Sequence, residues 1–130
     1  MKWKFEDAIM LKCIQISTSD NKTKSDFKTI FELFDELNHS VLTFENFKSS
    51  LEKLISVNFV EIDNENLTLT KHFLKEYAKL TDKLDSTNST EIITIHNFLN
   101  KSDFKIQELC KLDVQILNKI RNARFEYLKE

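Results

Sequence analysis

Apolar residues recur with helical spacing along most of the chain, and the clearest pattern lies between residues 42 and 71. Within this segment, apolar positions three and four residues apart predict an amphipathic helix from Thr43 to Ser56. Its apolar face consists of Phe44, Phe47, Leu51, Leu54 and Ile55. Thr43 is the predicted N-cap, and Leu42 and Phe47 have the spacing of a hydrophobic staple.

The residues after this helix predict a β-hairpin. Phe59–Ile62 and Leu67–Thr70 have the character of short strands, and residues 63–66 (DNEN) between them favour a turn. Asn58 follows the last periodic residue of the helix, where a left-handed backbone is needed. Gly usually fills that position, but this chain contains none, and Asn is the next best residue.

Two further helices are predicted before this segment and one directly after it. The first runs from Phe5 to about Ser17. The second is capped by Thr23 or Ser25. Its apolar face comprises Phe27, Ile30, Phe31, Phe34 and Leu37. Thr70 can cap a fourth helix. Three amphipathic helices followed by a hairpin predict a mainly α fold with a small β-hairpin, namely a winged helix with a three-helix core and a wing.

A polar stretch at residues 85–91 (DSTNSTE) divides a domain at 1–84 from a C-terminal helical extension at 85–130. Residues 92–99 form a short apolar segment in which β-branched residues leave helix and strand open, with helix favoured. A longer helix is predicted from Ser102 onward. One stripe of this region consists of Leu109, Leu112, Ile116, Ile120, Ala123 and Tyr127. Its spacing is typical of a packing seam, which predicts a homodimer; the alternative is that the stripe folds back over the first helix.

The run from Phe44 to Thr70 resembles the helix-and-wing half of bacterial winged-helix proteins such as the MarR-like and PadR-like regulators. The matching parts are LEKL at 51–54, Asn58, Phe59-Val60 and the LTLT run at 67–70. Residues 34–39 (FDELNH) followed by 43–45 (TFE) also resemble an uncharacterised group of bacterial winged-helix proteins, and the similarity extends over residues 5 to about 80. It implies that the helix at 43–56 enters the major groove of duplex DNA.

The predicted recognition helix carries residues suited to that role. Lys48 and Lys53 can contact phosphates, Asn46 can pair with adenine, and Ser49 can pair with several bases. Lys28, in the second helix, can add a further phosphate contact. These five residues are the predicted DNA-binding set.

Charge weakens this prediction. The formal net charge is −2, and 17 of the 19 basic residues are Lys. Glu61, Asp63 and Glu65 make the predicted wing acidic, although nucleic-acid binding requires a basic face. The alternative is therefore a winged-helix module that binds a protein partner and no DNA.

Candidate chemistry is sparse. Without Gly, the chain cannot form a phosphate-binding glycine loop. Asp35 with His39 and His72 with Glu76 have metal-ligand spacing but no third ligand nearby, so we expect neither a metal nor a cofactor, and no enzymatic activity. Cys13 and Cys110 are isolated and lie in apolar faces, which is typical of reduced core thiols.

The sequence also indicates where the protein is located and whether it binds a small ligand. The N-terminus has no signal-peptide pattern, and no segment has the length and apolarity of a membrane span. We therefore expect a cytoplasmic protein. A small apolar ligand between the core and the C-terminal extension stays open as an alternative, although no residue argues for it.

Overall fold

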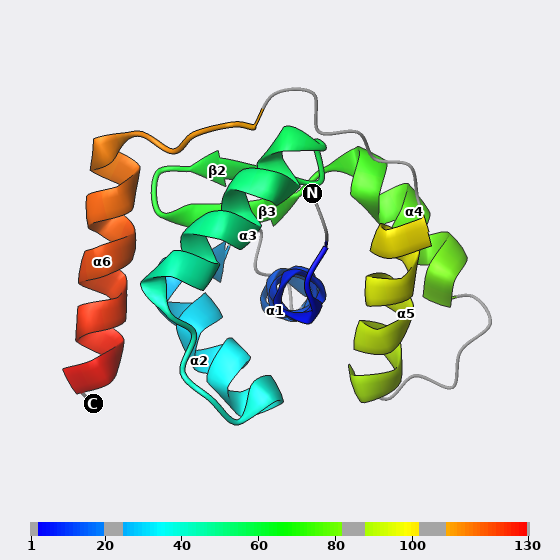
Figure 1. Cartoon of the computed structure of the whole chain (residues 1–130), viewed down its shortest axis with the longest axis horizontal. Helices are drawn as coiled ribbons and strands as arrows, with labels where there is room; N and C mark the ends of the chain where they lie inside the picture. The colour runs from blue at the N-terminus through cyan, green and yellow to red at the C-terminus, as the bar shows by residue number, and fades with distance from the viewer. Residues whose placement is uncertain (1–2, 20–24, 82–87, 102–108, 130) are drawn as a thin grey trace.

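The first part of the chain folds into three helices and a small antiparallel sheet (Figure 1). The computed structural model describes residues 3–19, 25–81, 88–101 and 109–129, and the statements below concern these residues. The elements, in chain order, are α1 (Phe5–Ser19), β1 (Ser25–Asp26), α2 (Phe27–Asn38), α3 (Phe44–Ser56), β2 (Val60–Asp63) and β3 (Asn66–Leu69). The predicted mainly helical fold with a small hairpin is confirmed.

The sheet places the hairpin against the start of α2. Strand β3 is central and pairs antiparallel with both β2 and β1. Val60 pairs with Leu69 and Asp63 pairs with Asn66, so both strands of the hairpin lie within one residue of their predicted bounds. The two-residue strand β1 was not predicted, because two residues are too few to show a period.

Side-chain caps explain where the helices begin. The Thr43 hydroxyl accepts a hydrogen bond from the Asn46 N–H (3.1 Å), which confirms the predicted N-cap of α3. Thr70 likewise caps the next helix. The cap of α2 is Asp26 rather than Ser25, which lies in β1; Thr23 lies outside the described residues. The Asp26 carboxylate also suits the positive end of a helix dipole better than a hydroxyl does.

Within the described ranges of this glycine-free chain, three residues with positive φ form turns. Asn58 has φ 61° after α3, as predicted, and Asn64 has φ 59° at the tip of the hairpin. His39 has φ 55° and caps the C-terminus of α2, where its N–H bonds to the Asp35 carbonyl. The left-handed conformation is costly for a residue with a Cβ atom, and Asn tolerates it better than His does.

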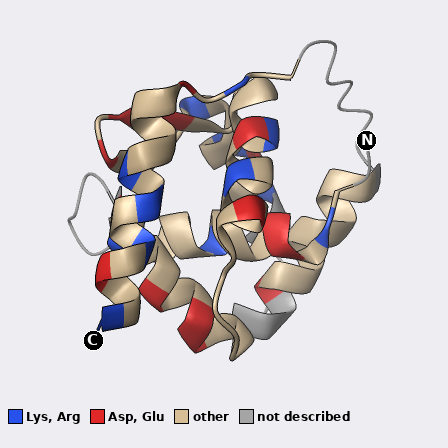
Figure 2. Cartoon of the chain, turned by 60° about the vertical axis from the view of Figure 1, so that its left-hand side comes forward, with Lys and Arg blue, Asp and Glu red and all other residues tan. Residues whose placement is uncertain are grey.

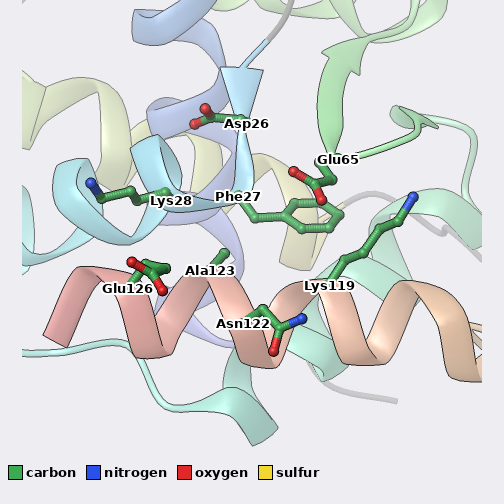
Figure 3. A pocket seen from close by; sticks show the side chains of 8 residues that line it. All are labelled: Asp26, Phe27, Lys28, Glu65, Lys119, Asn122, Ala123 and Glu126. Atoms are coloured by element: carbon green, nitrogen blue, oxygen red, sulfur yellow. The ribbon is translucent and has the colours of Figure 1, made fainter. Parts of the chain in front are cut away.

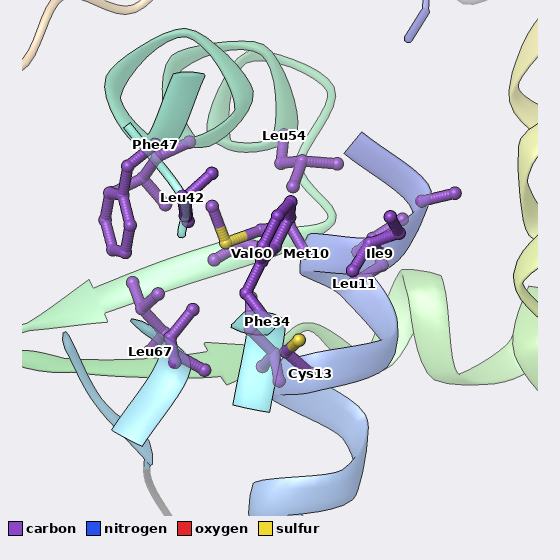
Figure 4. Close-up of a cluster of buried hydrophobic side chains, with 14 of the residues drawn as sticks. Ile9, Met10, Leu11, Cys13, Phe34, Leu42, Phe47, Leu54, Val60 and Leu67 are labelled. Atoms are coloured by element: carbon purple, nitrogen blue, oxygen red, sulfur yellow. The ribbon is translucent and has the colours of Figure 1, made fainter. Parts of the chain in front are cut away.

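Helix α1 lies in the middle of the core and is seen end-on in Figure 1. Residues 7–14 are all buried, because α2, α3, the sheet and a C-terminal helix surround α1. Phenylalanine rings fill the space beneath α3, where Phe31 stacks on Phe47 with ring centres 4.7 Å apart. Figure 4 shows part of this cluster. Each fully buried Phe contributes about 1.5–3 kcal/mol by leaving water.

The remaining helices pack on two different sides of this core (Figure 1). Helices α4 (Lys71–Thr81) and α5 (Asn88–Lys101) lie on one side, where α5 packs against α1. Helix α6 (Val114–Lys129) lies on the other side, against α2 and α3. The extension therefore shares one continuous core with residues 1–84, to which it contributes Ile92, Ile95, Leu99 and Ile120.

Two expectations for the extension need correction. Residues 88–91, predicted as part of a polar break, form the first turn of α5, whereas the predicted helix at 92–99 is confirmed. The long helix predicted from Ser102 is wrong at residues 109–113, which are not helical, because the helix begins only at Val114. The Asp113 carboxylate accepts a hydrogen bond from the Ile116 N–H and so starts the helix there. Residues 102–108 lie outside the described part.

The predicted dimer seam is used within the chain. Ile120 is fully buried, and Leu112, Ile116, Ala123 and Tyr127 pack against the core; Leu109 is half-buried. Tyr127 stacks near Phe31 and donates a hydrogen bond to Asp35, so the stripe covers α2 and α3 rather than α1, on which the fold-back alternative placed it. A homodimer would therefore have to use a surface other than this stripe, and it stays a prediction.

Substitution of His39 tests the strain at the end of α2. We expect His39→Gly to raise the free energy of unfolding by about 0.5–1 kcal/mol, because relief of the left-handed strain exceeds the entropy that Gly adds to the unfolded chain. His39→Val should lower it, since a β-branched residue tolerates positive φ least. Urea unfolding measures both changes. Equal stability of the two variants would contradict the assigned backbone conformation.

Candidate nucleic-acid interface

The N-terminal half of α3 presents three of the predicted DNA-binding residues. Ser49 is exposed, and Asn46 and Lys48 are half-buried. Glu45 is exposed beside them. In helix–turn–helix proteins the N-terminal residues of the recognition helix make the base contacts, so this is the half of α3 that the predicted DNA contacts concern. Polar side chains able to reach bases and one lysine are therefore accessible here.

Lys53 does not belong to this surface, and its predicted phosphate contact is wrong. Its ammonium group is buried, with the side chain 4% exposed, and forms an ion pair with Asp7 of α1. Ser50 donates to the other oxygen of Asp7 (2.5 Å), and the Trp3 ring lies 5.5 Å from the Lys53 nitrogen. A buried charge needs such partners, so Lys53 links α3 to α1 and is inaccessible to DNA.

The C-terminal half of the outer face of α3 is covered by residues 109–113, here called the C-terminal strap. The Cys110 N–H donates to the Ser56 hydroxyl (2.7 Å). The Leu112 N–H donates to the Glu52 carboxylate (3.0 Å), and Glu52 is buried. The sequence predicts Glu52, Lys53 and Ser56 as outward-facing, but their helix position says nothing about a segment that arrives from 60 residues away.

Lys28 lies apart from the other predicted DNA-binding residues. Together with Asp26, Glu65, Lys119 and others it lines an open pocket of about 290 Å³ between β1, α2, the hairpin tip and α6 (Figure 3). Lys28 also lies 3.9 Å from Glu32 in a surface ion pair. None of the predicted residues of α3 lines this pocket.

The tip of the hairpin is acidic, as the sequence predicts. Glu61, Asp63 and Glu65 are all exposed. Phosphates would be repelled at this surface, because like charges in the approach path oppose nucleic-acid binding. The hairpin does not offer the basic wing that would strengthen DNA binding.

Helix α6 supplies basic residues next to α3 that the predicted set lacks. The Arg121 guanidinium lies 4.4 Å from the ring centre of Phe44, which is one helical turn from Lys48. Arg124 donates from Nε to the Leu42 carbonyl (3.1 Å), directly before α3. In Figure 2 blue residues recur along α6, the helix that ends at the C-terminus. The sequence contains a signal for this basic surface, because residues 114–125 contain both arginines of the chain and no acidic residue.

A second buried ionic cluster holds the far side of α1. Lys12 forms an ion pair with Glu91 of α5 and donates to Gln15, and Tyr77 of α4 donates to the same Glu91 oxygen (2.6 Å). Burial, together with the Glu91 hydrogen bond and charge, raises the pKa of Tyr77 above its usual range. Burial also raises the pKa of the Cys13 thiol. Lys12, Tyr77 and Glu91 thus link α1, α4 and α5, and the Cys13 thiol is buried.

The pairs with metal-ligand spacing are engaged in other contacts. Asp35 accepts from Tyr127, and His72 stacks on Phe59 with ring centres 5.4 Å apart. Among the described residues there is no group of three or more His, Cys, Asp and Glu side chains that could hold a metal ion.

Another open pocket, of about 450 Å³, lies between the strap and the hairpin. Apolar side chains line much of it: Ile55, Val60, Ile62, Leu112 and Ile116. Glu61, Lys111 and Asp113 add charges of both signs to its lining. This is where the sequence left a ligand site open, and the lining selects no ligand class.

Comparison with known proteins does not assign the chain to a family. No family model, curated protein or solved structure matches it. Within the described ranges, no helix has both the length and the apolar character needed to cross a membrane.

The buried Asp7–Lys53 pair predicts a specific pattern of stability changes. Asp7→Asn leaves the Lys53 charge unpaired and should lower the free energy of unfolding by about 3–5 kcal/mol. The double variant Asp7→Asn/Lys53→Met removes both charges and should recover most of that loss, because an apolar side chain replaces a buried ion. Urea unfolding followed by the fluorescence of Trp3, the only tryptophan, measures both.

The surface pair Lys28 and Glu32 is the matched control. Glu32→Gln should change stability by less than about 0.5 kcal/mol, because exposed ion pairs contribute little. If Asp7→Asn had an equally small effect, Lys53 would be solvated and could again be considered for DNA contact.

Proposed function

We propose that this chain is a winged-helix DNA-binding protein, with a non-enzymatic role in transcription regulation, and that the N-terminal half of α3 reads the duplex. The element order α1-β1-α2-α3-β2-β3 supports the winged-helix assignment. Helices α2 and α3 are the helix–turn–helix pair, β2 and β3 form the wing, and β1 is the short third strand of the sheet. Such a role belongs in the cytoplasm.

One observation carries the proposal. The half of α3 that recognition helices use for base contacts is open, while the strap covers only the other half. Because the buried Glu52 and Lys53 lie in the covered half, they cannot oppose or assist DNA binding directly. The accessible polar groups are those of Asn46, Lys48, Ser49 and Glu45.

These residues have separate roles in the proposed complex. Asn46 and Ser49 contact base edges, since an amide can pair with adenine and a hydroxyl can donate to or accept from several bases. Lys48 contacts a phosphate and positions the helix. The acidic hairpin does not approach the backbone, so the binding energy comes from the α3 side of the molecule.

A salt titration tests the proposal. The chain is titrated into a fluorescein-labelled random duplex, and anisotropy is recorded from low to physiological salt. We expect binding that weakens steeply with salt, because phosphate contacts release counterions. Lys48→Ala should weaken binding and reduce the slope of log K against log salt by about one unit.

Lys75→Ala is the matched control, because Lys75 is an exposed lysine on α4 and makes the same change in net charge. It should leave the slope unchanged. Absence of binding at low salt would overturn the proposed function. Equal effects of the two lysine variants would show that α3 is not the DNA-contacting element.

The exposed surface of α6 favours a second candidate, a module that binds protein, including a second copy of this chain. Three large apolar side chains lie exposed on this helix: Val114 (70%), Phe125 (59%) and Leu128 (49%). Exposed apolar groups gathered on one element mark interaction sites more often than scattered ones do. Because the buried stripe of α6 is used inside the chain, this outer face is the one left for a dimer.

The mass of the protein in solution tests the dimer. Light scattering coupled to size exclusion should give about twice the chain mass of 15.4 kDa. Phe125→Glu should return the monomer mass, because a buried unpaired carboxylate is costly at an interface. Leu74→Glu, at a 47% exposed leucine on α4, is the control and should stay dimeric. A monomeric wild type at high concentration would exclude this interface.

A further inference from the structure

We propose that α6 is a phosphate-binding ridge, in which Arg121 contacts the DNA backbone beside the site that α3 reads. This inference rests on the proposed function and extends it to a surface that neither the predicted DNA-binding residues nor the wing includes. The partner chemistry is the phosphate backbone of duplex DNA. The argument has three parts: charge, placement of the guanidinium, and rigidity of the helix.

The charge of α6 differs from that of the rest of the chain. Residues 114–125 carry Lys119, Arg121 and Arg124 and no acidic residue, although the whole chain has a formal net charge of −2. The other exposed polar side chains of this stretch, at Gln115, Asn118 and Asn122, are amides that can donate hydrogen bonds to phosphate oxygens. A duplex can therefore meet donors from Arg121 and these amides, beside the exposed side chains of Val114 and Phe125.

Both arginines of the chain lie here, where the other 17 basic residues are lysines. Arginine differs from lysine in its planar fork of donors, which matches phosphate geometry and stacks on aromatic rings. Arg121 is exposed and stacks on Phe44, and its Nη1 lies 3.5 Å from the Asn118 side-chain oxygen. These contacts hold the guanidinium beside the first turn of α3, and its remaining donors can reach a phosphate.

The ridge is attached firmly to the DNA-reading part of the chain. Arg124 bonds to the Leu42 carbonyl, and Tyr127 bonds to Asp35 (2.5 Å). The strap fixes the start of α6 through Glu52 and Ser56. Because these contacts already order α6 in the free protein, a phosphate contact by Arg121 carries no entropic cost of ordering the helix.

The strap that covers the C-terminal half of α3 therefore also positions α6. The strap does not obstruct the base-reading half, and it places α6 next to that half. A helix of 16 residues is about 24 Å long and can follow a strand of the duplex over much of one helical turn. The ridge supplies the positive surface that the acidic hairpin lacks.

The experiment measures the salt dependence of binding for the full-length chain with the labelled random duplex. Arg121→Gln removes the charge and keeps the stem of the side chain. We expect its slope to fall by about one unit and its affinity to fall about eightfold near 0.1 M salt, since one phosphate contact contributes about 0.9 to the slope. Lys75→Ala, at the exposed lysine on α4, is the control outside the ridge and should leave the slope unchanged.

Phe44→Leu separates placement from charge. It removes the ring on which Arg121 stacks and changes no charge, so affinity should fall about two- to threefold with an unchanged slope. Circular dichroism and a urea curve establish that each variant is folded. Arg121→Lys, which keeps the charge, should preserve the slope even if Arg121→Gln is unstable.

The outcomes distinguish this inference from the proposed function. If the wild type does not bind, the proposed function fails and this inference fails with it. If binding depends on Lys48 but not on Arg121, the proposed function stands and the ridge is excluded. If Lys75→Ala reduces the slope as much as Arg121→Gln does, binding is a general effect of positive charge, which also excludes the ridge.

Discussion

The structure depends on the burial of two charged residues of α1. Asp7 and Lys12 lie at residues 7–14 of α1, where every residue is buried, and each is 4% exposed or less. An unpaired ion there would destabilise the core, so each requires a partner from another element. Asp7 binds Lys53 of α3, and Lys12 binds Glu91 of α5. The two pairs fix the orientation of α3 and α5 around α1. Apolar contacts alone are non-directional and would define that orientation less well.

The first of these pairs also determines which part of α3 can contact another molecule. Burying Lys53 turns the C-terminal half of α3 into part of the scaffold, and the strap completes this by binding Glu52 and Ser56. The accessible half begins at the Thr43 cap and lies beside the basic residues of α6. The surface proposed to bind DNA thus combines residues about 75 positions apart in the chain, such as Phe44 and Arg121.

The absence of Gly and Pro shapes the fold without preventing it. Three turns are made by His39, Asn58 and Asn64 in the left-handed conformation, at some cost in backbone strain. Long helices joined by such turns need few special residues, which suits a mainly helical fold. The apolar core is rich in Phe rings, which come from α2, α3, α4 and the residue before β2.

The sequence by itself determined the elements whose signals are local. The caps at Thr43 and Thr70, the left-handed Asn58 and the hairpin bounds follow from neighbouring residues, and so does the apolar face of α3. Only the tertiary structure decided what Lys53 and the stripe of α6 do. A lysine next to an apolar face can be solvated or form an ion pair. An apolar stripe can pack against a second chain or against its own chain. Each outcome depends on which distant segment packs against these residues. Helical period carries no information about that segment, so charge pairing and coverage by the strap became visible only in the folded chain.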